Sequence, residues 1–330
     1  MKKIFITGGA GYVGSMLVPY LLNKGHKVKV YDTLYYGHEF LPKNQNLSIV
    51  KGDIRDSAKL KEECKNYDIF IHLACISNDA SYVLDENLSK SINYDAFDPM
   101  VKAAKTNGIQ RFIYASTSSV YGVSDKKDVT EDHPLVPLTL YNKFKGLCEP
   151  ILLDQTDENM EGVIFRPATV CGYAPRLRLD LSVNILTNHA FNKNKITVFG
   201  GEQLRPNLNI KDYCSAVELL INAETNLIKN EIFNVGYENM SIMNLAELVQ
   251  LTFKERYSKD IEIVKTESND NRSYHINSDK ILKTLNFKPT HSIKDAIISL
   301  LDSFEANRIP NSFEDDIYFN VKRMQNLKVK

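Results

Sequence analysis

The stretch TGGAGYVGS, Thr7 to Ser15, decides the fold of the N-terminal half. It follows the apolar run KIFIT and places Gly8, Gly11 and Gly14 directly before a segment whose apolar residues have helical spacing. Glycine is needed because the turn from strand to helix is tight, because a side chain would hold the backbone away from a pyrophosphate, and because the helix packs close to the strand. The stretch therefore predicts a strand, a phosphate-binding loop and a helix whose free N–H groups favour an anion.

An acidic residue ends the second apolar run, KVKVYD. Asp32 lies 18 residues after Gly14, where a carboxylate accepts hydrogen bonds from both hydroxyls of an adenosine ribose and repels a 2′-phosphate. Thr33, rather than an arginine, follows it. We therefore predict NAD rather than NADP as the cofactor. The alternative is an ordinary glycine turn followed by a solvated aspartate.

Short strand-like runs alternate with helical patterns through the first half of the chain. Helical spacing of apolar residues occurs over residues 12–23, 57–65, 88–107 and 141–155, and the strand-like runs are KIFIT, KVKVYD, LSIVKGD, DIFIHLA, RFIYAS and EGVIFR. Strands rich in Ile, Val and Phe that alternate with helices indicate a parallel sheet buried on both faces. The expected fold class is α/β, with a Rossmann-type doubly wound parallel sheet.

The pattern becomes less regular after about Pro167. We expect a Rossmann domain over residues 1–168, with returning segments near 207–235, and a smaller mixed α/β substrate domain over 169–330. In this second half, helices are expected over 181–192, 212–222, 244–253 and, as the last one, 293–306. Strands are expected at KITVFG, EIFNVG and near IEIV.

Composition excludes several classes of partner. The chain has 330 residues, of which 43% are apolar, and its 41 basic residues balance 41 acidic ones, so we expect neither nucleic acid nor membrane as a partner. The five cysteines form no CxxC pair and have no histidine at metal spacing, so no metal site is predicted. No run approaches the roughly 20 apolar residues of a membrane span, and no signal peptide is recognised, so the expected location is the cytoplasm.

The segment YNKFK supplies a candidate acid–base pair. Tyr141 precedes Lys145 by four residues at the start of a predicted helix, so both side chains leave the same helix face. A phenol titrates near pH 10, and a lysine cation beside it favours the phenolate, which then accepts a proton from an alcohol. A YxxxK pattern alone also fits a surface helix; its place after the glycine loop and the hydroxyl-rich strand end favours catalysis.

Taken together, these motifs resemble the extended short-chain dehydrogenase/reductases of the nucleotide-sugar epimerase/dehydratase family, including the UDP-glucose 4-epimerase-like members. The resemblance covers nearly the whole chain and is carried by TGGAGYVGS, Asp32, GDIRD, HLACIS, Asn93, STSSVYG, YNKFK, RPATVCG and DNRSY. It implies a NAD-dependent enzyme that acts on a nucleotide-diphosphate sugar.

The resemblance also implies roles for individual residues. The catalytic residues are Thr117, Tyr141 and Lys145. The cofactor-binding residues are Gly8, Gly11, Tyr12, Val13, Gly14, Asp32, Asp53, Ile54, Leu73, Ala74, Cys75, Asn93, Tyr141, Lys145 and Pro167. The substrate-binding residues are Ser77, Thr117, Ser118, Asn184, Arg205 and Arg272. For Arg176 and Arg178 three interpretations stay open: closure over the sugar, a solvated loop, or an ion pair with Asp180.

The stretch ASTSSVYG, residues 115–122, bears on the reaction. In the family's 4,6-dehydratases an acidic pair or its equivalent follows the catalytic threonine, whereas Ser118 and Ser119 stand here. Because a serine hydroxyl is a poor acid and base, the resemblance favours hydride transfer at the sugar C4 without dehydration. A 4-epimerase is the main hypothesis and a 4-dehydrogenase or 4-keto reductase the alternative, with a 4,6-dehydratase less favoured. Many relatives carry Asn where this chain has Thr169. The resemblance places this difference near the sugar rather than near the dinucleotide, so it bears on the substrate and not on the cofactor. A non-catalytic NAD-sensing protein is the remote alternative.

A homodimer is expected from the same resemblance. Two predicted helices, 88–107 and 141–155, carry apolar residues that could form a four-helix bundle with a second copy. These residues are Phe97, Met100, Val101, Phe144, Leu147 and Ile151. Packing of the same residues on their own sheet is the alternative.

Overall fold

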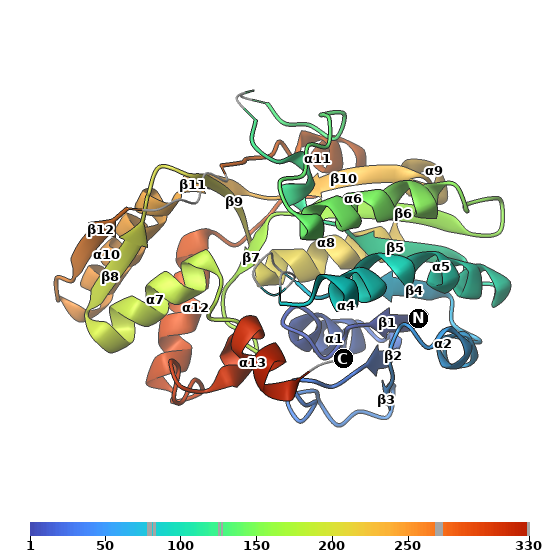
Figure 1. The fold of residues 1–330 in the computed structure, drawn as a ribbon, viewed down its shortest axis with the longest axis horizontal. Coiled ribbons are helices and arrows are strands. Elements are labelled where there is room, and N and C mark those ends of the chain that lie inside the picture. Colours follow the sequence, from blue (N-terminus) through green and yellow to red (C-terminus); the bar gives the residue numbers. More distant parts are fainter. Residues whose placement is uncertain (78–80, 82–83, 125, 127, 268–272, 329–330) are drawn as a thin grey trace.

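A sheet of seven parallel strands forms the centre of the N-terminal part (Figure 1). The structure is a computed structural model and describes residues 1–330 with the exception of 78–80, 82–83, 125, 127, 268–272 and 329–330. In spatial order the strands are β3 (Leu47–Lys51), β2 (Lys27–Asp32), β1 (Lys3–Thr7), β4 (Ile69–His72), β5 (Arg111–Ala115), β6 (Glu161–Pro167) and β10 (Glu231–Val235). The predicted Rossmann-type doubly wound sheet is confirmed.

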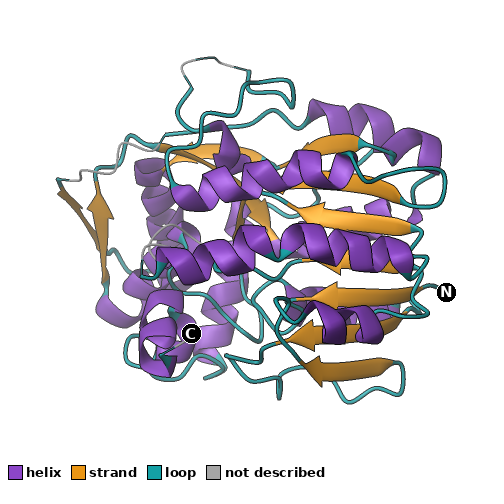
Figure 2. Cartoon of the chain, turned by 45° about the vertical axis from the view of Figure 1, so that its right-hand side comes forward, coloured by secondary structure: helices purple, strands orange, loops and turns teal. Residues whose placement is uncertain are grey.

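Helices cover both faces of this sheet, because its strands carry apolar side chains on both sides (Figure 2). On β1, Ile4 and Ile6 belong to the core on one face, whereas Phe5 belongs to the core on the other. The first core includes residues of α1 (Gly14–Asn23) and α8 (Ile210–Asn222). The second includes residues of α2 (Ser57–Glu63), α5 (Phe97–Thr106) and α6 (Leu140–Leu153).

The order of the strands reverses between β1 and β4. The chain continues from β1 to β2 and β3 on one side, and from β4 to β5 and β6 on the other. The connections leave in opposite directions at this point, so a crevice opens at the carboxyl ends of the two strands. The glycine loop, which follows β1, and residues 73–77, which follow β4, therefore lie at the same crevice.

The second half of the chain builds two further sheets beside the first (Figure 1). One has the order β11 (Glu238–Ser241), β9 (Leu204–Asn209), β7 (Thr169–Cys171), and the other pairs β12 (Glu262–Thr266) with β8 (Lys195–Phe199). The helices here are α7 (Ser182–Lys193), α10 (Ile242–Tyr257), α12 (Ile293–Glu305) and α13 (Asn320–Leu327). The short helices α9 (Thr225–Ile228) and α11 (Asp279–Leu285) flank β10. The domain boundary near residue 168 stays a prediction.

Two predicted helices differ from the structure. The segment 88–107 is not one α-helix: α4 (Glu86–Lys90) leads into a π-helical turn, Ser91–Asp95, before α5 begins. Over so few residues, the wider π-helical turn changes the spacing of apolar residues too little for the sequence pattern to reveal it. The helix over 293–306 is not the last one, because α13 follows it with a mostly polar sequence.

The prediction about the dimer helices is partly wrong. Phe97, Met100 and Val101 are almost completely buried in the core beneath α5, so they cannot face a second copy. On α6, Leu147 is 40% exposed. None of the described residues forms a helix long and apolar enough to span a membrane.

Candidate active site

Two adjoining cavities lie at the crevice between the sheet and the second half. The first, called the glycine-loop cavity, is lined by Gly8, Gly11, Tyr12, Val13, Asp32 and residues 73–77. The second, called the serine-rich cavity, is lined by Thr117, Ser118, Ser119, Asn142, Thr169 and Arg205. Tyr12, Val13, Ser77, Ser116, Tyr141, Pro167, Val170 and Arg178 line both. The two cavities therefore meet at Tyr141.

The glycine loop fits a dinucleotide phosphate. Gly8 has a φ of +76°, and a Cβ there would lie 2.5 Å from Ala74 N, so a side chain is excluded. A Cβ on Gly11 would meet only Gly8 O, at 3.3 Å, and would otherwise point into open space. The N–H groups of Tyr12 and Val13 donate to no acceptor among the described residues, and they begin α1. Open space and free N–H groups at a helix N-terminus suit an anion.

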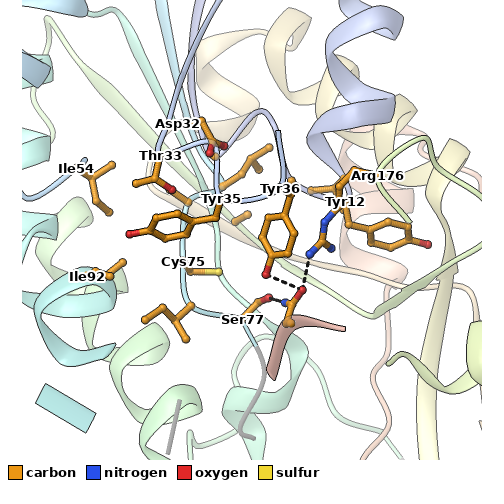
Figure 3. Close-up of a pocket in the computed structure, with 18 of the residues that line it drawn as sticks. Tyr12, Asp32, Thr33, Tyr35, Tyr36, Ile54, Cys75, Ser77, Ile92 and Arg176 are labelled. Atoms are coloured by element: carbon orange, nitrogen blue, oxygen red, sulfur yellow. Dashed lines mark hydrogen bonds between the residues drawn. The ribbon is translucent and has the colours of Figure 1, made fainter. Parts of the chain in front are cut away.

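Asp32 ends β2 at the rim of the same cavity. Its carboxylate accepts hydrogen bonds from Ala10 N at 3.0 Å and Leu34 N at 2.8 Å, which fix its orientation. Burial raises the pKa of Asp32, while these two N–H groups and the Arg176 cation lower it. Tyr35 and Ile54 lie nearby, as Figure 3 shows, and form an apolar wall beside the carboxylate. A ribose with its base fits this corner.

The tyrosine and lysine of α6 lie at the junction of the cavities. Thr139 caps the helix, and Tyr141 follows in its first turn. Lys145 is 3% exposed, and its Nζ donates to Ala115 O at 2.5 Å and lies 4.6 Å from the centroid of the Tyr114 ring. Both Tyr141 and Lys145 line the glycine-loop cavity, which places the pair as the sequence predicts. Their catalytic roles stay predictions.

The hydroxyl-rich segment after β5 forms the floor of the serine-rich cavity. Thr117 Oγ1 lies 2.8 Å from Ser119 Oγ, which in turn donates to Asn142 Oδ1 at 2.5 Å. Thr117 Oγ1 also accepts from Ser119 N, in a short 3-10 turn, Ser118–Tyr121. This chain of hydrogen bonds positions the threonine hydroxyl near Tyr141.

Most of the predicted site residues lie around these cavities. The glycine-loop cavity includes Gly8, Gly11, Tyr12, Val13, Asp32, Asp53, Ile54, Leu73, Ala74, Cys75, Tyr141, Lys145 and Pro167. The serine-rich cavity includes Ser77, Thr117, Ser118 and Arg205. Arg272 lies outside the described residues. Gly14, Asn93 and Asn184 line neither cavity.

These three residues act behind the cavity walls. A Cβ on Gly14 would lie 2.3 Å from Gly9 O, so this glycine permits the close packing of α1 on the loop. Asn93 donates to Ile76 O and accepts from Ile76 N, at 2.9 and 2.8 Å, and so holds the loop after β4. Asn93 thus supports the cavity from behind and does not line it. Its contact with the cofactor stays a prediction.

Asn184 lines neither cavity, and its predicted contact with a diphosphate stays a prediction. Its side chain is completely buried, donates to Arg178 O and Tyr12 Oη, and accepts from Gly172 N. All of its polar atoms are thus used by the protein. It positions Tyr12 and the segment that carries Arg178.

Arg178 and Asp180 form an ion pair on the wall of the serine-rich cavity. Arg178 Nε lies 2.9 Å from Asp180 Oδ1, and Nη2 lies 3.2 Å from Oδ2. Burial raises the pKa of Asp180, but the Arg178 cation prevails and holds it below its ordinary value. Of the three interpretations for this arginine, the ion pair is confirmed, and the side chain is buried rather than solvated. Its Nη1 also donates to Ser77 Oγ at 3.2 Å.

Sequence reasoning missed several residues of the glycine-loop cavity. These are Tyr35, Tyr36, Ile92, Asn320 and Met324. The two tyrosines follow Asp32 within four positions, which is a usable signal. Asn320 and Met324 belong to α13, far along the chain, and no motif marks them. No cluster of His, Cys, Asp or Glu suited to a metal ion occurs among the described residues.

Comparisons with known proteins agree with this geometry. The family described as "NAD dependent epimerase/dehydratase family" matches residues 4–236. A UDP-glucose 4-epimerase of Lactobacillus helveticus is 26% identical over 95% of this chain and 99% of its own. A UDP-N-acetyl-alpha-D-glucosaminuronate decarboxylase of Bacillus cytotoxicus is 30% identical over 76% and 80%.

Among solved structures, a dTDP-glucose 4,6-dehydratase of Streptomyces venezuelae with NAD superposes with a TM-score of 0.82, at 22% identity, over 93% of this chain and 98% of that one. The similar proteins thus share the fold and differ in their named reactions. The family match spans most of the chain and includes the glycine loop, Asp32 and the Tyr141–Lys145 pair. The chain therefore belongs to the NAD-dependent epimerase/dehydratase family of extended short-chain dehydrogenases/reductases, and it is an enzyme with NAD as its cofactor.

Proposed function

We propose that this enzyme acts on a nucleotide-diphosphate sugar by hydride transfer at C4, and that it is a nucleotide-sugar 4-epimerase. The observation that carries this proposal is the position of Tyr141, which lines both the glycine-loop cavity and the serine-rich cavity. A base at such a junction reaches a sugar in one cavity beside a nicotinamide in the other. The similarity to a UDP-glucose 4-epimerase over nearly the whole chain supports the same reaction.

The residues at the junction supply the proton chemistry. NAD, when bound, supplies the acceptor for a hydride. Tyr141 takes the proton of the C4 hydroxyl, and Thr117 holds that hydroxyl by a hydrogen bond. Lys145 lies one helical turn beyond Tyr141 and is buried, so its cation favours the phenolate strongly. On the return step Tyr141 gives the proton back to the alkoxide of the other stereoisomer.

The serine-rich cavity offers little support for dehydration. Elimination of water needs an acid for the leaving hydroxyl and a base for the neighbouring C–H. Among the described residues that line this cavity, Asp180 is the sole carboxylate, and it is held by two hydrogen bonds from Arg178. Ser118 and Ser119 occupy the positions after Thr117. A carboxylate with a lowered pKa and two N–H donors is a weak base and is not an acid.

Arg205 is the described cation best placed for the substrate's diphosphate. It lines the serine-rich cavity from β9, and its guanidinium carbon lies 5.2 Å from the centroid of the Tyr274 ring. An arginine fork binds phosphate through parallel hydrogen bonds, and the aromatic ring keeps the guanidinium plane in place. Arg272 stays a predicted second contact.

Product analysis tests the reaction directly. The purified protein is incubated in D2O with nucleotide-activated hexoses and heptoses, without added NAD, and the products are followed by NMR and by the absorbance of reduced nicotinamide. We expect a C4 epimer without deuterium at C4 or C5, because the same hydride leaves and returns. One reduced cofactor per released ketosugar would instead show a 4-dehydrogenase. Loss of water with deuterium at C5 would show a dehydratase.

We also propose a homodimer and a cytoplasmic location. Because the apolar residues Phe97, Met100 and Val101 of α5 are buried, the apolar surface left for a second copy lies on α6, around Leu147. Light scattering is expected to give twice the chain's 37.6 kDa; a mass of one chain at micromolar concentration would refute the dimer. All five cysteines are unpaired, as suits a reducing compartment.

A further inference from the structure

Four arginine side chains are buried among the described residues, and one of them differs from the rest. Arg111, Arg166 and Arg178 each form an ion pair with a carboxylate, namely that of Glu161, Glu149 or Asp180. Arg176 is 3% exposed and forms no ion pair with any described carboxylate. A buried cation without an anion is costly, because it has lost its hydration without compensation.

The contacts of Arg176 leave part of its guanidinium unused. Its Nη2 donates to Asn320 Oδ1 at 2.5 Å, and its guanidinium carbon lies 3.6 Å from the centroid of the Tyr36 ring. Its Nε has no hydrogen-bond partner among the described residues, although the atom is buried. Burial lowers the pKa of Arg176 to about 10, so the side chain is still a cation at neutral pH.

The position of this cation is defined by the glycine loop. Arg176 N donates to Ser15 Oγ at 3.2 Å, in the first turn of α1, and the side chain lines the glycine-loop cavity. Figure 3 shows it between Tyr12 and Tyr36, on the opposite side of the cavity from Ile54. It therefore faces the space in front of the free N–H groups of Tyr12 and Val13, where a dinucleotide's diphosphate is expected to lie.

We propose that Arg176, from the second half of the chain, binds the diphosphate of NAD from the side opposite the glycine loop. The diphosphate supplies the anion that this buried guanidinium lacks, through a charge-assisted interaction with the part of the side chain that lines the cavity. The proposal rests on NAD as the cofactor and not on the proposed reaction at C4.

The last helix completes the arrangement. Asn320, at the start of α13, accepts from Arg176 and from Tyr36 Oη, and it donates to Ser77 Oγ at 2.8 Å. Arg323 donates to Tyr35 O at 2.8 Å. The helix thus joins the loop after β2 to the loop after β4, across the cavity that NAD enters.

Binding and unfolding measurements on nucleotide-free protein test the role of Arg176. The probe is NADH, titrated by its fluorescence, with ADP-ribose and adenosine as competitors that carry and lack the diphosphate. In Arg176→Met we expect NADH and ADP-ribose to bind about 10- to 100-fold more weakly, as for loss of a charge-assisted hydrogen bond, while adenosine binds as before. Arg176→Lys keeps the charge and is expected to lose less.

The unfolding temperature separates ligand binding from a purely structural role. Without nucleotide, Arg176→Met is expected to melt at or above the parent's temperature, because it removes an uncompensated buried charge, and NAD is expected to raise that temperature less than in the parent. A lower melting temperature with an unchanged NAD-induced rise would show that Arg176 only supports α13. NADH affinity of Arg176→Met within twofold of the parent would also overturn the proposal. If the methionine variant does not fold, the ratio of the ADP-ribose affinity to the adenosine affinity, measured in the lysine variant, decides.

Discussion

Replacement of Tyr141 by phenylalanine is expected to reduce turnover of the nucleotide sugar by 10²- to 10⁴-fold, on the order of what a positioned general base contributes. The ring stays at the junction of the two cavities, and only the oxygen that takes the C4 proton is lost. NADH affinity is expected to stay within about twofold, since the glycine loop and Asp32 are unchanged. Single-turnover kinetics with the active nucleotide sugar and NADH titration provide the two measurements.

Tyr94→Phe is the matched control. Tyr94 lies in the π-helical turn, lines neither cavity and packs against Phe144. Its hydroxyl has no part in the proposed chemistry, so this variant is expected to turn over sugar at the parent's rate. Turnover by Tyr141→Phe within threefold of the parent's rate, in folded protein that binds NADH, would contradict the proposed role of the phenol.

Two alanine substitutions in the glycine loop are expected to have different effects: Gly14→Ala lowers the stability of the protein, and Gly11→Ala lowers its affinity for NAD. In Gly14→Ala the new Cβ would lie 2.3 to 2.7 Å from three backbone atoms of Gly9, so the loop must shift. We expect a loss of about 1–3 kcal/mol or more in the free energy of unfolding, as for overpacking, together with weak NAD binding. In Gly11→Ala the Cβ meets only Gly8 O at 3.3 Å, so the nucleotide-free protein is expected to melt within a few degrees of the parent.

The methyl group of Gly11→Ala occupies space that faces the cavity, where the cofactor's phosphate must approach the backbone. We therefore expect NAD affinity to fall by about tenfold or more in this variant, although its stability is kept. Thermal melts with and without NAD and an NADH titration measure both effects. Equal losses of stability in the two variants would contradict the separate roles of these glycines.

Much of the fold follows from the sequence because its main signals are local. The apolar strands and the glycine loop need only neighbouring residues to be recognised, and the strands of the central sheet, with β8 and β12, lie where the pattern predicts them. The strands β7, β9 and β11 and the short helices α9 and α11 were not predicted. The π-helical turn at Ser91–Asp95 was missed because a one-residue widening does not alter apolar spacing enough to show. The polar helix α13 was missed because it lies over a cavity rather than on an apolar core.

The residues of the candidate site also divide into those that a local sequence signal marks and those that no local signal marks. Residues at or just beyond the carboxyl end of a strand, such as Gly8, Asp32 and Thr117, could be placed because the carboxyl ends of parallel strands meet at one edge of a sheet. The partners of Asn184, which are Arg178 O, Tyr12 Oη and Gly172 N, could not be predicted, because a polar residue on a helix gives no sign of which polar atoms the fold will offer it. Asn320 gave no signal at all, since its partners Arg176 and Ser77 come close only in the folded chain.

The place of β10 at the end of the central sheet has a consequence for how the chain can be divided. Residues 231–235 join the sheet only after the chain has passed through β7, β8 and β9, and they pair with residues 163–167 of β6. A polypeptide that stopped near residue 168 would leave the N–H and C=O groups of β6 unpaired, as a template on which other molecules can add strands. Such a fragment is expected to be prone to aggregation, so we expect the two halves to fold as one cooperative unit.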